Sequence, residues 1–521
     1  MDLIALQNES EQPLYIQLYE GIKERIVNGH MTAQSKLPSK RYLMKAYNLS
    51  QNTVENALFL LQEEGYIVSE ARRGYYVANR ELLYKESNTH KASDVKVKAK
   101  DEFLYDFTYS GVDISRLPSK MLQKLAKEVY EETTLDFAFS GPVQGYEPLR
   151  QSICQYLGQS RGVMARPEQI VISAGTEYLF HIVFKLLPHE LYGIENPGYK
   201  MLQQLFTTNE VAYCPISLDE QGLIVRDLEA QQVNVACVTP SHQFPTGRIM
   251  PIARRQALLN WVNGADNRYI IEDDYDSEFK YQGRPIPALK ARDKALGEGR
   301  IIYMGSFSKS ISPALRVSYM VLPDRLLAIY KKKMPYFGCP VGTVSQKVLH
   351  KFIEKGYFVK HLNRMRTAYK KKREVLVKAL YEESARLLGQ SVVIEGAEAG
   401  LHLVITLPKQ IDEAKFMKAC KEGGIKIYSL KNYFLPHSSS NEAGKMAIVK
   451  ALDAKATDLE LAALVERTMD VEGSSLGNSD GNINAFAMGP TFVLGYASLS
   501  RKEIQAGVGL LMKYAKHAMR K

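Results

Sequence analysis

The strongest constraint on the fold is a regular alternation of short apolar runs with helical patterns between residues 104 and 323. Candidate strands include the short apolar runs at residues 170–172, 233–238, 269–271, 301–303 and 319–322. Each run has the length of a buried strand, and strands that alternate with helices predict a mostly parallel sheet. We therefore expect an α/β domain over residues 104–323.

The rest of the chain divides around this domain, because 521 residues exceed the length of one ordinary domain. Residues 79–103 are polar and lysine-rich (KESNTHKASDVKVKAKDE), which predicts a flexible charged linker after an amino-terminal domain at 1–78. A long basic helical stretch predicts a helical connection leading into a smaller carboxyl-terminal subdomain over 324–521. Within it, the polar segment at about 436–490 is expected to be a surface insertion.

Composition and charge narrow the class of protein. No apolar run approaches the roughly 18 residues that span a bilayer, and the sequence MDLIALQNESEQ lacks a secretory pattern. The five cysteines have neither disulfide nor zinc spacing. We expect a cytoplasmic protein with no membrane partner and no metal. The net charge of +11 does not by itself indicate DNA, because residues 1–80 hold nine basic and nine acidic side chains.

The amino-terminal domain has the pattern of a small helical DNA-binding fold. Leu14, Leu18, Ile22 and Ile26 lie four apart on one helix face. A second helix is expected after Pro38, a third is capped by a serine at position 50, and two short strands follow at 66–68 and 75–77. Three helices and a hairpin with a basic tip predict a winged helix-turn-helix of the α+β class.

In that motif the amino-terminal residues of the last helix meet base edges in the major groove. Glutamine and asparagine side chains suit adenine, whereas arginine neutralises phosphates and adds affinity without sequence choice. The expected DNA-binding residues are Gln51, Asn52 and Thr53 on the helix, with Arg41, Arg72 and Arg73 at phosphates. The alternative is a winged helix that contacts protein instead of DNA.

The segment LPSKRYLMKAYNLSQNTVENALFLLQEEGYI, followed by RRGYYV, resembles the GntR family of bacterial repressors over residues 13–77. Members of that family usually carry arginine where this chain has Gln51, and some carry a basic residue at Glu55. The resemblance therefore implies binding to a double-stranded DNA operator whose sequence differs from those of typical members.

In the α/β region, the motif SFSK places Lys309 among Ser306 and Ser308, just after the apolar run 301–303. A lysine amine forms a Schiff base with an aldehyde cofactor, while nearby hydroxyls hold a phosphate. Arg316, seven residues on, suits a bidentate phosphate contact. The alternative for this motif alone is a solvated lysine.

Three further motifs are compatible with the same cofactor. In IEDDYD, Asp273 suits a protonated pyridine nitrogen and Tyr275 a phenolic oxygen, although a capping or metal-binding acid cluster is the alternative. In ISAGTE, Gly175 and Thr176 open a helix whose N-terminus attracts phosphate. In ENPGY, Tyr199 can lie against a cofactor ring or pack in its loop.

The order of these motifs, together with TPSHQFPTG and MGSFSKSISPALRVSYMVLP, resembles fold-type I aminotransferases over about residues 104–512. With the amino-terminal domain, the chain is similar to the MocR subfamily of GntR-type regulators. The resemblance implies pyridoxal 5'-phosphate (PLP) as cofactor and a head-to-tail homodimer. It implies that Lys309 forms the internal aldimine, that Asp273 pairs with the pyridine nitrogen and that Tyr275 approaches the phenolic oxygen. The remaining implied contacts are ring stacking by Tyr199 and phosphate contacts from Gly175, Thr176, Ser306, Ser308 and Arg316.

The chain departs from ordinary aminotransferases beside the cofactor ring. Where those enzymes have Asn-Pro-Thr-Gly, this chain has Phe244 before Pro-Thr-Gly. The asparagine normally supports the ring oxygen, which leaves His242 or Gln243 as possible substitutes, or no substitute at all.

A second departure concerns the substrate carboxylate. Ordinary enzymes place an arginine near the last strand, where this chain has Leu494, and GABA-responsive relatives have one at Met201. Those relatives have another in the loop that here contains Lys431 and Asn432. A bidentate arginine contact contributes roughly 1.5–3 kcal/mol, so we do not expect efficient turnover of common amino acids.

These observations predict a PLP-dependent transcriptional regulator whose aminotransferase-like domain senses PLP or an amino compound through an aldimine at Lys309. The alternative is an active aminotransferase with an accessory DNA-binding domain. A third possibility is PLP itself as the signal. We expect regulation rather than enzymatic turnover, because the DNA-binding pattern is intact and the carboxylate arginine is replaced.

Overall fold

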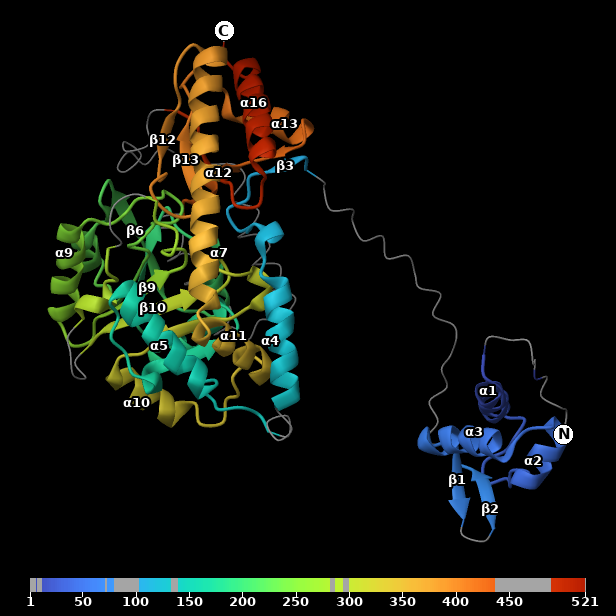
Figure 1. Ribbon diagram of the computed structural model, residues 1–521. Helices are drawn as coiled ribbons and strands as arrows, with labels where there is room; N and C mark the ends of the chain where they lie inside the picture. Colours follow the sequence, from blue (N-terminus) through green and yellow to red (C-terminus); the bar gives the residue numbers. More distant parts are fainter. Residues whose placement is uncertain are drawn as a thin grey trace, which may run out of the picture. The chain divides into compact units, whose positions relative to one another are not determined.

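The computed structural model describes residues 6, 12–70, 73–78, 103–132, 139–281, 286–293, 299–435 and 489–520. The chain divides into two compact units, Met1–Lys100 and Asp101–Lys521, each described by itself below (Figure 1). Most of the linker expected at 79–103 and most of the insertion expected at 436–490 lie outside the described residues. No described helix is long and apolar enough to cross a membrane.

The amino-terminal unit is a winged helix-turn-helix. Helices α1 (Leu14–Val27), α2 (Lys40–Tyr47) and α3 (Gln51–Glu63) precede the antiparallel strands β1 (Ile67–Glu70) and β2 (Gly74–Val77). The hydroxyls of Ser39 and Ser50 accept the backbone N–H of Tyr42 and Thr53, so each serine caps the start of a helix. Leu18, Ile22 and Ile26 of α1 are buried against side chains of α2 and α3, as the four-residue spacing predicted.

The large domain of the second unit is built on an eight-stranded sheet in the order β4-β11-β10-β9-β8-β5-β6-β7. Its strands are β4 (Ile170–Ser173), β5 (Tyr192–Asn196), β6 (Tyr213–Asp219), β7 (Gly222–Leu223), β8 (Val235–Val238), β9 (Tyr269–Asp274), β10 (Ile301–Ser306) and β11 (Ser318–Val321). The pairs β5–β6, β5–β8, β8–β9 and β9–β10 are parallel, while β11 is antiparallel to both its neighbours. The mostly parallel α/β sheet predicted from the sequence is confirmed.

Helices cover both faces of this sheet (Figure 1). They are α4 (Ser119–Glu132), α5 (Glu147–Arg161), α6 (Thr176–Leu186), α7 (Lys200–Thr208), α8 (Val225–Ala230), α9 (Ile252–Asn263), α10 (Asp324–Lys333) and α11 (Thr343–Glu354). Short 3-10 turns, η2 (Ile114–Arg116), η3 (Pro167–Gln169), η4 (Lys290–Arg292) and η5 (Pro313–Leu315), complete the layers. Because the parallel strands end at one edge, the loops after β5, β8, β9 and β10 meet there, where ligands bind in open α/β sheets.

The small subdomain packs a four-stranded antiparallel sheet, in the order β12-β13-β16-β15, against helices. Its strands are β12 (Val393–Glu395), β13 (His402–Thr406), β15 (Tyr428–Ser429) and β16 (Thr491–Gly495). The helices are α12 (Tyr357–Leu388), α13 (Glu413–Glu422) and α16 (Arg501–His517), with the 3-10 turn η6 (Leu430–Tyr433). Strand β3 (Tyr105–Asp106) pairs with β14 (Ile425–Lys426), so the segment at 105–106 joins the small subdomain rather than the large sheet.

Candidate functional site

A turn between β4 and α6 brings a glycine against an arginine. Gly175 has a φ of +105° and precedes the first residue of α6. A Cβ atom at this position would lie 2.3 Å from Nη2 of Arg316, so only glycine lets the guanidinium approach the helix N-terminus. Arg316 donates to the carbonyl of Ala174 at 3.1 Å and pairs with Glu177. A guanidinium at a helix N-terminus is a favourable place for a phosphate.

Two hydroxyls lie at the end of β10 and in the turn after it, which leads to the lysine. Ser306 Oγ donates to Ser308 Oγ at 2.9 Å and accepts the backbone N–H of Ser308 at 3.1 Å. The pair fixes the turn in the conformation that carries Lys309. Both hydroxyls have the chemistry to bind phosphate oxygens, as the sequence predicted, and no contact between them and Arg316 is needed for that role.

Lys309 is held by a backbone carbonyl from a distant part of the chain. Its Nζ donates to the carbonyl of Tyr109 at 2.5 Å and lies 5.9 Å from the centre of the Tyr109 ring. Burial lowers the pKa of Lys309 to about 8, although the carboxylate of Asp276 acts in the opposite direction. The free amine, which is the form that attacks an aldehyde, is therefore present at a lower pH than for an ordinary lysine.

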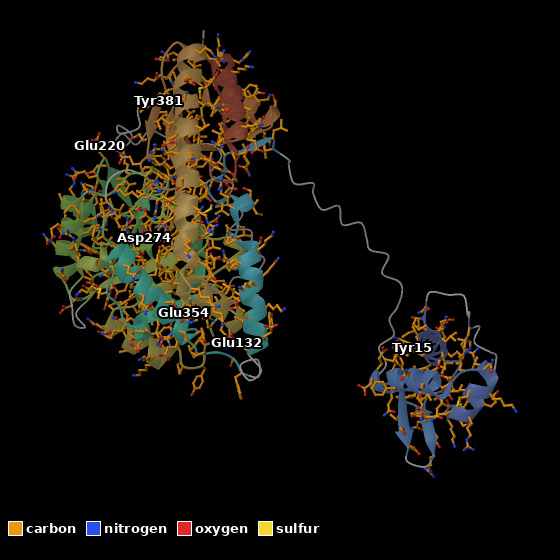
Figure 2. All side chains as sticks on the ribbon, in the orientation of Figure 1. Tyr15, Glu132, Glu220, Asp274, Glu354 and Tyr381 are labelled. Atoms are coloured by element: carbon orange, nitrogen blue, oxygen red, sulfur yellow. The ribbon has the colours of Figure 1, made fainter. Side chains whose placement is uncertain are left out.

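The acidic motif at the end of β9 separates its aspartates between two faces of the sheet. Asp274, labelled in Figure 2, is buried, pairs with Arg161 of α5 at 2.8 Å and accepts from Tyr303 at 2.6 Å. Asp273 faces the opposite side, and burial, Asp274, Asp276 and other nearby acids raise its pKa to about 7. A protonated pyridine nitrogen would supply the positive charge that this carboxylate lacks among the described residues.

A small cavity of about 50 Å³ lies at this edge of the sheet, and its lining residues come from α6, from β5, β8 and β9, and from the segments that follow β5 and β8. Its lining includes Thr176, Glu195, Tyr199, Cys237, Thr239, Phe244 and Asp273. Tyr199 precedes α7 and is partly exposed, and its ring centre lies 5.4 Å from that of Phe244, with the two rings nearly perpendicular. The cavity therefore brings together Thr176, Tyr199 and Asp273, which lie far apart in the sequence.

Glu195 is a pocket residue that sequence reasoning missed. Burial raises its pKa to about 7, and it accepts from Thr239 Oγ1 at 2.5 Å and from Gln243 Nε2 at 3.3 Å. The available signal was a charged residue at the end of an otherwise apolar run. Because glutamate is common in turns after strands, that signal does not distinguish a pocket residue from an exposed one.

In the loop where this chain has Phe244 before Pro-Thr-Gly, the side chains are held by contacts with neighbouring residues. Phe244 packs 4.7 Å from Tyr109 and 5.3 Å from Tyr433, measured between ring centres. The Gln243 amide donates to the carbonyl of Pro197 at 3.1 Å, and its oxygen accepts from Thr246. Gln243 is therefore occupied within the loop.

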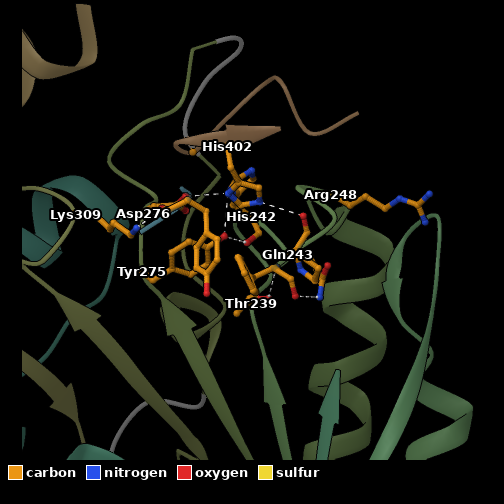
Figure 3. Close-up of polar contacts among 12 residues, drawn as sticks. Thr239, His242, Gln243, Arg248, Tyr275, Asp276, Lys309 and His402 are labelled. Carbon is orange, nitrogen blue, oxygen red and sulfur yellow. Dashed lines mark hydrogen bonds and ion pairs between the residues drawn. The ribbon is translucent and has the colours of Figure 1, made fainter. Parts of the chain in front are cut away.

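His242 lies next to Tyr275 (Figure 3). The hydroxyl of Tyr275 donates to the His242 carbonyl at 2.9 Å and lies 3.1 Å from Nδ1. His242, Asp276 and His402 offer three ligand atoms within 4.8 Å of one another. We interpret the cluster as a hydrogen-bonded network, because His242 Nδ1 donates to Asp276 and His402 Nε2 donates to the carbonyl of Pro245, which leaves neither nitrogen a lone pair for a metal ion.

The positions where arginine would bind a substrate carboxylate carry other side chains. Met201 is partly exposed at the pocket, and Leu494 is fully buried in β16. Lys431 pairs with Glu413 at 2.8 Å. In the described part of this region, neither apolar residue can pair with a carboxylate, and the lysine already has a partner.

In the amino-terminal unit, the start of α3 and the tip of the hairpin present polar side chains to solvent. Gln51, Asn52 and Arg41 are exposed, and the Gln51 amide donates to Glu55 at 3.2 Å. Arg73 pairs with Glu70 at 3.3 Å while remaining 75% exposed. Thr53 is partly buried and bonds the capping hydroxyl at position 50. Arg72 lies outside the described residues.

Comparison with known proteins identifies two families along the chain. The family described as "Aminotransferase class I and II" matches residues 112–440, and "Bacterial regulatory proteins, gntR family" matches residues 14–77. The chain is 37% identical to the uncharacterized HTH-type transcriptional regulator YdeL of Bacillus subtilis, over 84% of this chain and 93% of the relative.

Two other relatives match most of the chain. The probable rhizopine catabolism regulatory protein MocR of Rhizobium meliloti is 29% identical over 83% of this chain and 89% of its own. The HTH-type pyridoxine biosynthesis transcriptional regulator PdxR of Corynebacterium glutamicum is also 29% identical, over 83% of this chain and 91% of its own. Among solved structures, the multiple substrate aminotransferase of Thermococcus profundus has a TM-score of 0.61 at 21% identity, covering 84% of this chain and 98% of that one. This likeness shows the fold of the second unit.

Proposed function

The chain belongs to the MocR-type transcriptional regulators, which join a gntR-family helix-turn-helix to an aminotransferase class I and II domain, and we propose that a ligand at Lys309 controls its binding to DNA. One observation carries this proposal: Lys309, with a pKa lowered to about 8, and Asp273, with a pKa raised to about 7, flank the same end of the sheet. A lysine that loses its proton readily and a buried carboxyl that lacks a cation suit an aldehyde on a protonated ring, because the ring nitrogen would supply that cation and favour the carboxylate.

The residues present fit PLP. When bound, this cofactor supplies an aldehyde for amine exchange and a ring that withdraws electrons. Lys309 would hold it covalently, Asp273 would pair with its ring nitrogen, and Tyr199 would lie against the ring face. Tyr275 and, from behind it, His242 would support the phenolic oxygen side. The phosphate would be bound by Gly175, Thr176, Ser306, Ser308 and Arg316, with Arg316 exchanging Glu177 for the phosphate.

The signal is a small amino compound or PLP itself. An effector acts only through a difference in its affinity for two arrangements of the protein. Occupation of Lys309 removes its hydrogen bond to Tyr109, in the segment that leads back to the DNA-binding unit. The state of the lysine therefore has a direct effect on that segment, which supports sensing at this site.

The DNA-binding unit would contact a double-stranded operator in the cytoplasm through Gln51, Asn52 and Thr53. Arg41, Arg72 and Arg73 would add contacts to phosphates, which raise affinity at every sequence. A head-to-tail homodimer would present two such units, as palindromic operators require. Exposure of Gln51 and Asn52 at the start of α3 supports this assignment.

An active aminotransferase with an accessory DNA-binding domain is the second candidate function. The retained Lys309 and Asp273 favour it, because both are needed for amine exchange. The replacement of carboxylate-binding arginine by Met201 and Leu494 acts against it for common amino acids. Half of a transamination cycle remains compatible with the site.

The experiment that separates these functions combines absorption spectroscopy with operator binding. The purified full chain is mixed with PLP, then with a panel of amino compounds, and finally with excess keto acid. A visible band that shifts with one amine, changes DNA affinity and yields no repeated turnover supports the regulator. Repeated turnover without any change in DNA affinity would support the enzyme, and a wild-type chain that forms no visible band would refute the role of Lys309.

A further inference from the structure

Two buried side chains behind the pocket form a hydrogen bond that no proposed cofactor contact uses. His242 is 1% exposed and Asp276 is 2% exposed, and His242 Nδ1 lies 2.9 Å from Asp276 Oδ2. A carboxylate oxygen accepts, so Nδ1 carries the proton of this bond. The other carboxylate oxygen, Oδ1, and Nε2 of the ring have no partner among the described residues. The imidazole is therefore what holds this carboxylate in place.

The imidazole itself is fixed by tight backbone packing. A Cβ atom at Gly400 would lie 2.0 Å from Cε1 of His242 and 2.5 Å from Oδ2 of Asp276, and one at Gly247 would lie 3.2 Å from Nε2. The ring of His402 lies 4.7 Å away, and its Nε2 bonds the carbonyl of Pro245 at 3.1 Å. Because the surrounding atoms leave no space, the ring cannot turn away from the carboxylate.

Three titratable groups from different segments of the chain interact with the amine of Lys309. They are Asp276 after β9, His402 in β13 and Tyr109 after β3. Burial lowers the pKa of His402 well below its usual range, and burial raises that of Tyr109, so both side chains are neutral near pH 7. The carboxylate of Asp276, drawn beside Lys309 in Figure 3, is the group that favours the charged lysine.

We propose that His242 and Asp276 are positioning residues: the imidazole fixes a buried carboxylate beside Lys309, and the charge of that carboxylate sets the fraction of lysine present as free amine. The inference rests on the proposed function only in taking Lys309 as the residue that receives an aldehyde. Neither side chain needs to touch the cofactor. Without the carboxylate, burial alone acts on the lysine, and free amine is present at lower pH.

The test uses the full chain and PLP as the probe. The second-order rate constant for the appearance of the visible band is measured against pH for the wild type, D276N, H242L and H242N. We expect a wild-type midpoint near pH 8, the pKa of Lys309. D276N should lower this midpoint by about one pH unit, and H242L should shift it in the same direction. H242N should keep the wild-type midpoint, because its amide N–H replaces Nδ1 as the donor.

Wild-type midpoints in D276N and H242L, with bands of normal intensity, would overturn the proposal. Should D276N fail to fold, H242L compared with H242N tests the same prediction, and equal midpoints in these two variants would overturn the proposal. His350 offers a matched control, since it bonds Ser152 between α11 and α5 and H350N should leave the midpoint unchanged.

A measurement without cofactor separates this inference from the proposed function. Trace acetylation of the PLP-free wild type, followed by mass spectrometry of the peptide that holds Lys309, reports the same midpoint. A midpoint near 8 with no PLP band would refute the proposed function and leave the inference intact. A midpoint above about 10, the ordinary lysine value, would overturn the inference even if the PLP band forms.

Discussion

The Nζ atom of Lys309 donates to the backbone carbonyl of Tyr109 at 2.5 Å, across 200 positions of sequence. Tyr109 follows β3, which pairs with β14 of the small subdomain. The reactive amine is thus tied to a segment that packs with the carboxyl-terminal part of the chain. Any ligand that bonds covalently to Lys309 competes with this hydrogen bond.

Removal of the lysine side chain should loosen this segment. In K309A, we expect no visible band with PLP and faster amide hydrogen exchange in residues 105–110 of the PLP-free protein. The increase should be about fivefold, corresponding to the roughly 1 kcal/mol of one hydrogen bond. Exchange measured by mass spectrometry on the wild type and K309A checks this, and equal protection in both would mean that Tyr109 is held by its ring contacts alone.

The buried carboxyl groups make the PLP-free protein sensitive to pH. Burial raises the pKa values of Asp273 and Glu195 to about 7, above their ordinary values near 4. A raised folded-state pKa gives stability that is present below the unfolded value and is lost as pH rises through the folded value. We therefore expect a lower melting temperature at pH 8 than at pH 5 in calorimetry of the PLP-free chain.

The variant D273N should separate stability from cofactor binding. At pH 8 it removes a buried charge, so the PLP-free variant should be more stable than the wild type by on the order of 1–2 kcal/mol. The same change should weaken PLP binding at least tenfold, because a neutral amide does not pair with a protonated ring nitrogen. Denaturant unfolding and PLP titration measure the two effects; a less stable D273N would show that the charge of Asp273 is compensated.

Gly175, which we propose as part of the phosphate site, should tolerate no side chain. In G175A the added Cβ would lie 2.3 Å from Arg316 Nη2, at a φ of +105°. We expect PLP affinity to fall at least tenfold, in line with strain of about 1–3 kcal/mol. Gly338 is the matched control, since a Cβ there meets nothing within 4 Å. Similar PLP affinities for G175A and G338A would contradict the assigned cradle.

DNA recognition can be tested with two glutamines on one helix. Gln51 is exposed at the start of α3, and Gln62 is exposed near its end. Q51A should weaken binding to a selected operator by about 1–3 kcal/mol and relax the choice of one base, whereas Q62A should leave binding unchanged. Fluorescence anisotropy with operator variants checks both, and equal effects of the two changes would place the recognition surface elsewhere.

A phosphate contact should behave differently from a base contact. R73A should lower affinity evenly across sequences and reduce the salt dependence of binding by about one ion. The side chain is 75% exposed and pairs only with Glu70 among the described residues, so the fold should not suffer. An unchanged salt dependence of DNA binding would show that the hairpin does not contact DNA phosphates.

Periodic patterns predicted much of the fold. The four-residue spacing from Leu14 to Ile26 and the apolar runs that became β4, β8, β9, β10 and β11 were sufficient, because burial of one face or of a whole strand leaves a regular signal. Strands β5 and β6 lacked this regular apolar signal, because β5 ends in Glu195 and Asn196 and β6 contains a proline. Both are buried by neighbours that local sequence does not specify.

By itself, the sequence determined which residue types can do the chemistry, namely a lysine, an aspartate, an arginine and two serines in a characteristic order. The conformations of Gly175 and Ser306 follow from local turns, because their backbone angles and hydrogen bonds involve residues that are close in the sequence. Only the tertiary structure decided that Glu195 faces the pocket, that Gln243 is occupied in its loop and that His242 holds Asp276. These outcomes depend on contacts between segments that are remote in the chain, and on the loss of water around them, which no short-range pattern encodes.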